Sequence, residues 1–428
     1  MKRAASIVAA AAALAVTFVL STQMTIVEGQ GQMNDTSAVP GGKGGQDVFG
    51  AYTVANWPKP LTALPGHGDW TWGAGQGVFA ESPDRVFVLQ RGELPTIHKR
   101  PATVKVAPSI EFPIGRLPVR DATSASPPGA LFKQGTQEPG DDLDTGQPGT
   151  DWRWEHIVTV FNAQGDLVED WTQWDKMFRR PHAVYISPYD PQKNIYIVDD
   201  YRHSVFKFSN DGKKLLQTIG TPNVPGNDAT HFYRPTFMAW LPSGEFFVAD
   251  GYQNTRVVKF DRDGKYLMAW GERGEAGGKE SRPGYFNNVH GVAVDPQTRR
   301  VFVNDRNNGR VQVFDENGKF LDQWSFGPRT YSDIHLFIIP SDRNLWAFDR
   351  GTSKMLKYSL DGKFLYQWGT WGDFPGAFWG VHGMAVDSAG NVYTAAVDSG
   401  GAQKFTPRPG ANPNFLLGKQ VTPGWGTN

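Results

Sequence analysis

Cysteine is absent from all 428 residues of this chain. Its absence excludes disulfide bonds, thiolate metal sites and thioether-linked haem, so any metal must bind imidazole, carboxylate or backbone oxygen. An excess of charge of either sign is also missing, because 43 Lys and Arg residues balance 43 Asp and Glu residues. A neutral chain gives no reason to expect nucleic acid or an anionic membrane as a partner.

The N-terminal segment has the composition of an export signal. Lys2 and Arg3 precede an apolar run from Ala4 to Leu20, and small residues for cleavage follow near Gly29. We predict a signal peptide over residues 1–29, with an uncleaved anchor as the alternative, and hence a secreted or periplasmic protein. Residues 30–48 are rich in Gly and polar residues, which predicts a disordered linker.

Residues 285–326 carry the pattern on which the fold prediction rests. Four short runs alternate apolar and polar residues, namely HGVAV, RVFVND, RVQVF and KFLDQW. Such alternation is typical of half-buried strands, and turn-forming residues separate the runs. The pair Asn317-Gly318 predicts a tight two-residue hairpin. About forty residues of antiparallel meander correspond to one propeller blade.

The same pattern recurs along the chain at intervals of about fifty residues. First strands begin near His182, Thr236, His290, His335 and His382. A unit interrupted by an insertion precedes them, and the last unit, from Phe378 to about Leu417, is less regular. Six units that bury their faces against neighbours predict an all-β, six-bladed β-propeller over residues 49–428. A strand within residues 49–54 would join the last blade and close the ring. A Pro- and Gly-rich insertion at about 93–150 is expected to be a lid or a disordered loop.

Histidine recurs at the position that opens the first strand. Around the ring this position holds Gln76, His182, Thr236, His290, His335 and His382. First strands are innermost in a propeller, so the imidazoles from blades two, four and six should converge on the axis. Three imidazoles with an open position are typical of a catalytic metal site. Inheritance by repeat duplication is the alternative explanation.

His335 adds a fourth imidazole at the same position of blade five. Four imidazoles would suit iron or copper better than tetrahedral zinc. His335 is otherwise expected to face the channel as a substrate-binding or acid–base group.

Two further residues lie where the repeat does not require them. Tyr252 follows the second strand of blade three, and Arg306 follows that of blade four. Second strands end beside the start of first strands in an antiparallel pair, so both should lie on the histidine rim. A phenol near a metal can act as a base, and a guanidinium can hold a carboxylate. Arg91 and Arg350 end second strands too and are candidate substrate-binding residues.

At these residues the chain resembles the peptidyl-α-hydroxyglycine α-amidating lyase (peptidylamidoglycolate lyase) family of NHL-type propellers. The resemblance covers roughly residues 67–404 and is sharpest in PHAVYI, VADGYQNTRVVKF, VHGVAV, VNDRNNGRVQVF and VHGMAV. It implies zinc held by three histidines, which fall on His182, His290 and His382. It also implies Tyr252 as the general base and Arg306 as a substrate-binding arginine. The family's reaction splits a carbinolamide C–N bond into an amide and glyoxylate.

The chain departs from the family pattern at several positions. His67 stands where the family has a second active-site arginine, and it is a further candidate for substrate binding. Gly383 replaces an aspartate that helps to hold a structural calcium, which puts calcium binding in doubt. Gln253 occupies the place of a disulfide cysteine.

These observations lead to three hypotheses about function. The first is an exported zinc-dependent carbon–nitrogen lyase that acts on a small-molecule or peptide substrate of the α-hydroxyglycine type. The second is a non-catalytic NHL-type binding propeller, because propellers serve both purposes. The third is an iron enzyme for oxygen chemistry that uses His182, His290, His335 and His382 together. No oligomeric state follows from the sequence.

Overall fold

The computed structural model describes residues 47–96, 103–107, 110–113, 152–275, 280–327 and 332–425. The chain divides into two compact units, residues 1–42 and 43–428, and the first lies outside the described residues. The predicted signal peptide over 1–29 also lies outside them, as does the linker over 30–48 apart from its last two residues. Most of the predicted insertion at 93–150 is likewise not described. No helix among the described residues is long and apolar enough to span a bilayer.

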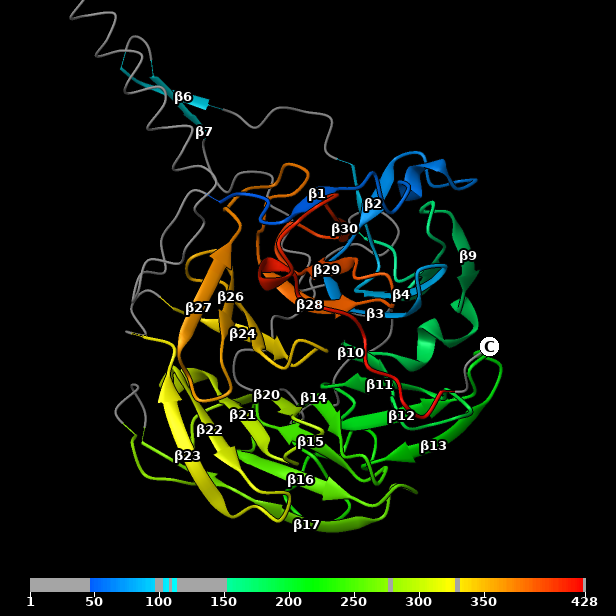
Figure 1. Cartoon of the computed structure of the whole chain (residues 1–428). Helices are drawn as coiled ribbons and strands as arrows, with labels where there is room; N and C mark the ends of the chain where they lie inside the picture. Colours follow the sequence, from blue (N-terminus) through cyan, green and yellow to red (C-terminus); the bar gives the residue numbers. More distant parts are fainter. Residues whose placement is uncertain are drawn as a thin grey trace, which may run out of the picture. The chain divides into compact units, whose positions relative to one another are not determined.

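Six four-stranded antiparallel sheets form the blades of a β-propeller, which confirms the predicted fold class (Figure 1). Each blade runs outward from an inner strand to an outer one. Blades one to three consist of β3 (Gly75–Ser82), β4 (Arg85–Gln90), β8 (Val158–Phe161) and β9 (Leu167–Asp170); β10 (Pro181–Ile186), β11 (Ile195–Asp199), β12 (Ser204–Phe208) and β13 (Leu215–Ile219); and β14 (Pro235–Trp240), β15 (Phe246–Asp250), β16 (Arg256–Phe260) and β17 (Tyr266–Trp270).

Blades four to six consist of β20 (Val289–Val294), β21 (Val301–Asp305), β22 (Arg310–Phe314) and β23 (Phe320–Ser325); β24 (Ile334–Ile338), β25 (Leu345–Asp349), β26 (Lys354–Tyr358) and β27 (Phe364–Trp368); and β28 (Val381–Val386), β29 (Val392–Ala396), β30 (Ala402–Pro407) and β1 (Tyr52–Val54). Two-stranded sheets are formed by β2 (Trp70–Trp72) with β5 (Glu93–Pro95), β6 (Thr103–Ala107) with β7 (Ile110–Pro113), and β18 (Glu272–Arg273) with β19 (Tyr285–Phe286). The 3₁₀ turns are η1 (Leu61–Ala63), η2 (Thr172–Met177), η3 (Arg306–Asn308) and η5 (Pro413–Phe415).

Strand β1 closes the ring, as predicted from the residues around it. It pairs antiparallel with β30, so the first and last strands of the propeller share blade six. Tyr52 is buried, and its ring lies 5.4 Å from that of Trp368 in blade five. The Tyr52 hydroxyl accepts a hydrogen bond of 2.7 Å from the backbone N–H of Leu417. Closure in this way removes the free edge that β30 would otherwise present.

Tryptophans at the outer strands connect neighbouring blades. A Cβ added to Gly318 in the last hairpin of blade four would lie 2.9 Å from the Trp270 ring of blade three. A Cβ added to Gly362 would likewise lie against Trp324, and one added to Gly212 would lie against Trp171. Blade two ends in Ile219 instead, and there Gly264 of blade three meets Gln217. These tryptophans therefore pack between neighbouring blades.

The predicted two-residue hairpin at Asn317-Gly318 is wrong. Five residues, 315–319, separate β22 from β23, and only Gly318 adopts a positive φ, of 78°. The Asp315 side chain accepts hydrogen bonds from the N–H groups of Asn317 and Lys319. An aspartate that caps the turn in this way favours a wider loop with a single left-handed residue over a turn with two.

Candidate active site and metal centre

The ring position lies at a β-bulge in every blade. Pairing between the first two strands shifts register at the second residue of each inner strand, for example between Val289 and Gly291 in blade four. The residues at the six shifts are Gln76, His182, Thr236, His290, His335 and His382. A bulged residue leaves the ladder and its side chain is re-aimed. The bulges therefore explain why these side chains leave the sheet pattern.

The structure brings His182, His290 and His382 together. Each offers one ring nitrogen, and these nitrogens all lie within 4.8 Å of one another. All three side chains are buried. His335 lies outside this set of three, with its ring centroid 6.0 Å from that of His290 and 5.6 Å from that of His382. The three alternating blades thus supply the convergent imidazoles.

Backbone carbonyls of the next blade orient the rings. His290 Nδ1 lies 2.6 Å from the His335 carbonyl oxygen, and His382 Nδ1 lies 2.8 Å from that of Gln76. Because a carbonyl oxygen only accepts, Nδ1 carries the proton and Nε2 keeps its lone pair in the neutral ring. His182 differs, since its buried Nδ1 has no hydrogen-bond partner among the described residues.

Burial keeps these imidazoles neutral. It lowers the pKa of His182 and of His290 well below 6.5, and nearby guanidinium groups, Arg180 and Arg91 for His182 and Arg306 for His290, lower them further. Burial also lowers the pKa of His382 to about 3, although its hydrogen bond to the Gln76 carbonyl opposes the shift. Neutral imidazole is the form that ligates metal.

Tyr252 lies against two of the three histidines. Its hydroxyl oxygen is 2.7 Å from His290 Nε2 and 3.2 Å from His182 Nε2. The residue follows β15 in blade three, between the blades that supply these histidines. The structure therefore brings the predicted base and the predicted ligands into one group.

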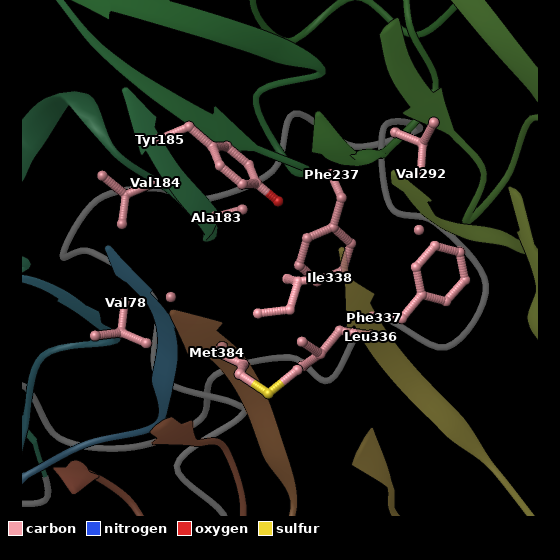
Figure 2. A pocket seen from close by; sticks show the side chains of 13 residues that line it. Val78, Ala183, Val184, Tyr185, Phe237, Val292, Leu336, Phe337, Ile338 and Met384 are labelled. Atoms are coloured by element: carbon pink, nitrogen blue, oxygen red, sulfur yellow. The ribbon is translucent and has the colours of Figure 1, made fainter. Parts of the chain in front are cut away.

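Phe237 packs against the three-histidine group. In blade three the register shift spans two residues, so Phe237 is re-aimed together with Thr236. Its ring centroid lies 4.8, 5.3 and 5.5 Å from those of His182, His290 and His382. Figure 2 shows Phe237 beside Leu336, Ile338 and Met384 in an apolar stretch of channel. The Phe237 ring thus brings apolar surface against the three imidazoles.

Arg306 and Arg350 also lie near this group, each paired with a carboxylate. Two nitrogens of Arg306 bind Asp333, at 2.8 and 2.9 Å. Asp333 raises the pKa of Arg306, although burial acts in the opposite direction. Arg350 binds Asp398 through two nitrogens in the same manner. Each ion pair uses Nε and one Nη of its guanidinium, so the opposite edge of the guanidinium still carries N–H donors.

Comparisons with known proteins show which proteins this chain is similar to. A family model for six-bladed β-propellers matches residues 286–370. Peptidyl-α-hydroxyglycine α-amidating lyase 1 of Drosophila melanogaster is 35% identical over 185 residues, which are 41% of this chain and 33% of that protein. NHL repeat-containing protein 3 of Mus musculus is 32% identical over 176 residues, which are 39% of this chain and 48% of that protein.

The chain is thus a six-bladed β-propeller that is similar in sequence to α-amidating lyases and to an NHL repeat-containing protein. Peptidylglycine α-amidating monooxygenase of Rattus norvegicus is also similar, with 39% identity over 145 residues, or 33% of this chain and 14% of that protein. The chain thus spans less than half the length of each of these relatives.

This propeller also has an arginine cluster in which Arg91 was a candidate from the sequence, whereas Arg180 and Arg234 were not. Arg234 donates two hydrogen bonds to Asp200, and Arg180 lies 3.5 Å from the same carboxylate. Burial opposes ionisation of Asp200, yet Arg180, Arg234 and Arg91 hold its pKa below the ordinary value. Three guanidinium groups thus surround one carboxylate.

The cluster adjoins the predicted base. The Arg234 guanidinium carbon lies 4.7 Å from the centroid of the Tyr252 ring. Arg91 is buried and donates to the Gln76 side chain at 3.3 Å. Arg180 and Arg234 each stand two residues before the ring position. That repeated spacing is the signal by which they could have been found.

Two other features lie beside the three-histidine group. His67, predicted to bind substrate, instead contacts Glu93 at 2.8 Å, in a separate cluster with His156. A groove of about 840 Å³ is lined by Asp398, the partner of Arg350, and by the aromatic residues Trp72, Phe374 and Trp379. This groove offers apolar surface next to the charged pair.

Proposed function

We propose that this propeller is an exported, metal-dependent lyase that breaks the carbon–nitrogen bond of an α-hydroxyglycine-type substrate and releases glyoxylate. The observation that supports it most is the Tyr252 hydroxyl lying against two of three buried, convergent imidazoles. The lyase names of several relatives support the reaction class. The signal peptide predicted over residues 1–29 supports export.

Zinc fits the three-histidine set. Neutral imidazole nitrogen is a preferred zinc ligand, and three protein ligands leave a position for substrate. The donor atoms lie within 4.8 Å of one another, and carbonyl acceptors on Nδ1 leave Nε2 as the donor in His290 and His382. A bound zinc ion would polarise the substrate hydroxyl and make its proton easier to remove. Gly383 has no side-chain oxygen, so the proposal includes no calcium.

Tyr252 is the group placed to take the hydroxyl proton. Its oxygen lies within hydrogen-bond reach of His182 and His290, so a substrate hydroxyl at these imidazoles would also lie within its reach. Once the O–H bond breaks, the oxygen forms the aldehyde C=O of glyoxylate. The electron pair of the C–N bond goes to nitrogen, which takes up a proton and leaves as the amide. Arg234 brings positive charge next to the phenol ring.

The carboxylate of such a substrate would be held by the arginines. Arg306 is the predicted partner, and Asp333 already binds its Nε and one Nη, which leaves its other edge for the substrate. Arg91, Arg180 and Arg234 gather around Asp200 and bring positive charge to this side of the site. A carboxylate there would form charge-assisted hydrogen bonds. The groove at Asp398 has room for the acyl or peptide part.

Glyoxylate release from an N-acyl-α-hydroxyglycine, measured together with the metal content of the purified protein, tests this proposal. The wild-type protein is expected to contain zinc and to release glyoxylate. His290→Ala is expected to lose the metal of this site and the activity together. His231→Ala, at a histidine that pairs with Asp228 away from the channel, is the matched control and should retain both.

Two results would overturn the proposal. The first is a His290→Ala variant that still releases glyoxylate at the wild-type rate. The second is a wild-type protein that is inactive when loaded with zinc, which would leave a non-catalytic binding propeller as the function.

A further inference from the structure

A second group of metal-ligand residues lies where the chain leaves β4 and where it returns to β8. His67 Nδ1 is 2.8 Å from one carboxylate oxygen of Glu93, and His156 Nδ1 contacts the other oxygen. One donor atom of each residue lies within 4.8 Å of the other two. Glu93 is completely buried, and the side chain of His67 is 13% exposed. The group is therefore enclosed but still reachable from solvent.

The chemistry of the group suits a divalent transition metal. Two imidazoles and one carboxylate are a common ligand set for zinc and are also suited to other first-row metals. His156 Nε2 lies 2.9 Å from Asp170, so the second nitrogen of a ligand would donate to a carboxylate. Metal-bound histidines usually have such an outer partner, which fixes the ring and strengthens the ligand.

The local charge also suits a cation. Glu93 and Asp170 are two carboxylates on one pair of imidazoles, and the Asp175 side chain accepts hydrogen bonds from the backbone of His156 and Ile157. Burying a carboxylate such as Glu93 is costly unless a partner compensates its charge. A divalent ion would do so, and a proton shared along the chain of His67, Glu93, His156 and Asp170 is the competing explanation.

The folding repeat does not account for this group. His67 lies before blade one, Glu93 belongs to β5, and His156 lies before β8, so none of them occupies a repeated position. Glu93 and Arg153 form an isolated antiparallel bridge, and β5 pairs with β2. The three side chains therefore connect three parts of the chain. His67 lies before blade one, and Glu93 and His156 flank the segment from residue 97 to 151.

We propose that His67, Glu93 and His156 form a second divalent-metal site, which is separate from the three-histidine site and clamps the ends of this segment. The site acts in stability, because an ion that binds only the folded chain raises the free energy of unfolding with the logarithm of its concentration relative to its Kd. It does not depend on the proposed lyase function, since it shares no residue with the three-histidine group.

Metal content by elemental analysis tests the proposal, with the full-length protein loaded with Zn²⁺ and then freed of excess ion. The wild type is expected to hold two equivalents. His67→Ala and Glu93→Gln should each hold one, as should His290→Ala, and the combination His67→Ala with His290→Ala should hold none. The affinity of His67→Ala for the second Zn²⁺ should be at least about 100-fold lower than that of the wild type, because the variant lacks one of the proposed ligands.

Thermal unfolding gives a second measurement that does not depend on turnover. Added Zn²⁺ should raise the Tm of His290→Ala, which retains the second site, and should not raise the Tm of the double variant. His67→Ala, at the partly exposed end of the group, serves if Glu93→Gln fails to fold.

One equivalent in the wild type that His67→Ala retains and His290→Ala loses would overturn the proposal and favour the shared-proton explanation. Two equivalents retained in both His67→Ala and Glu93→Gln would overturn it as well. Loss of lyase activity in His290→Ala bears only on the three-histidine site, so the two proposals can fail separately.

Discussion

At the scale of single residues, the second residue of each inner strand differs in chemistry from blade to blade, although the blades share one fold. Three of these positions hold convergent histidines, His335 and Thr236 bind backbone carbonyls, and Gln76 meets Arg91. The bulge at each position separates the side chain from the ladder, so substitution there alters the channel more than the sheet.

Tyr252→Phe removes the proposed base and leaves the ring in place. We expect glyoxylate release to fall by about 10²–10⁴-fold, which is the usual contribution of a positioned acid–base group. Metal content should stay at the wild-type level, because the phenol is not one of the three imidazole ligands. Tyr285→Phe, in β19 outside the channel, is the control and should keep wild-type activity. Undiminished activity in Tyr252→Phe would exclude the phenol as the base.

His203 should make stability depend on pH. Burial lowers the pKa of His203 from 6.5 to about 4, and nearby Arg179 and Arg234 contribute although Asp200 opposes them. Between these two values the unfolded chain binds the proton and the folded chain does not, so stability is full above about pH 6.5 and falls as the pH drops towards 4. The loss is on the order of 3 kcal/mol.

His203→Asn should remove this dependence. Asparagine tolerates the positive φ of 56° at this position and can still accept the N–H of Arg234, but it does not titrate. The fall in Tm between pH 7 and pH 4.5 should be smaller in the variant than in the wild type. Equal falls would mean that His203 is not responsible.

At the scale of the strand and hairpin, a glycine in the last turn of one blade leaves room for the tryptophan of the preceding blade. The relation holds for Gly318 with Trp270, and it is absent at blade two, where Ile219 ends the outer strand. Each contact links two blades that share no ladder hydrogen bonds, so it stabilises the ring and not the single sheet.

Gly318→Ala and Gly284→Ala separate the two costs of a substitution at such a turn. Both glycines have a φ of 78°, but a Cβ at Gly318 would meet Trp270 at 2.9 Å, whereas one at Gly284 would have no neighbour within 4 Å. Gly284→Ala should cost about 1 kcal/mol of unfolding free energy through its backbone alone. Gly318→Ala should cost a further 1–3 kcal/mol through overpacking. Equal Tm values for the two variants would disprove a role for the tryptophan contact.

At the scale of the whole molecule, closure depends on three residues near the start of the described chain. Strand β1 supplies the fourth strand of blade six and covers the edge of β30. Tyr52 also contacts Trp368 of blade five and the backbone of Leu417. Blade six is thus complete only when the two ends of the propeller meet.

Truncation at two points tests this closure. Removing residues 1–46 should leave the Tm unchanged, because β1 remains. Removing residues 1–54 should lower it by more than 10 °C or make the protein aggregate, since the loss of buried Tyr52 alone costs about 3–5 kcal/mol and the edge of β30 becomes free. Thermal unfolding and size-exclusion chromatography give the comparison. Similar Tm values for both truncations would show that β1 is dispensable.

The sequence by itself determined the blade number, the closing strand and the ring position. The blade number and the ring position follow from short-range patterns, because strands of a meander pair with their sequence neighbours and a repeat places equivalent residues equivalently. The closing strand pairs with the far end of the chain and follows instead from the need to cover the last free edge of the ring. The same reasoning put Tyr252 and Arg306 at the ends of second strands, where the structure has them.

Only the tertiary structure decided what those residues touch. Arg306 is held by Asp333, Phe237 turns with Thr236 onto the imidazoles, and His67 lies with Glu93 and His156. Each of these contacts joins segments that the repeat does not relate, or depends on a bulge that shifts a side chain by one position. Periodicity specifies which strands are neighbours, but side-chain contacts between blades depend on distances that no local pattern encodes.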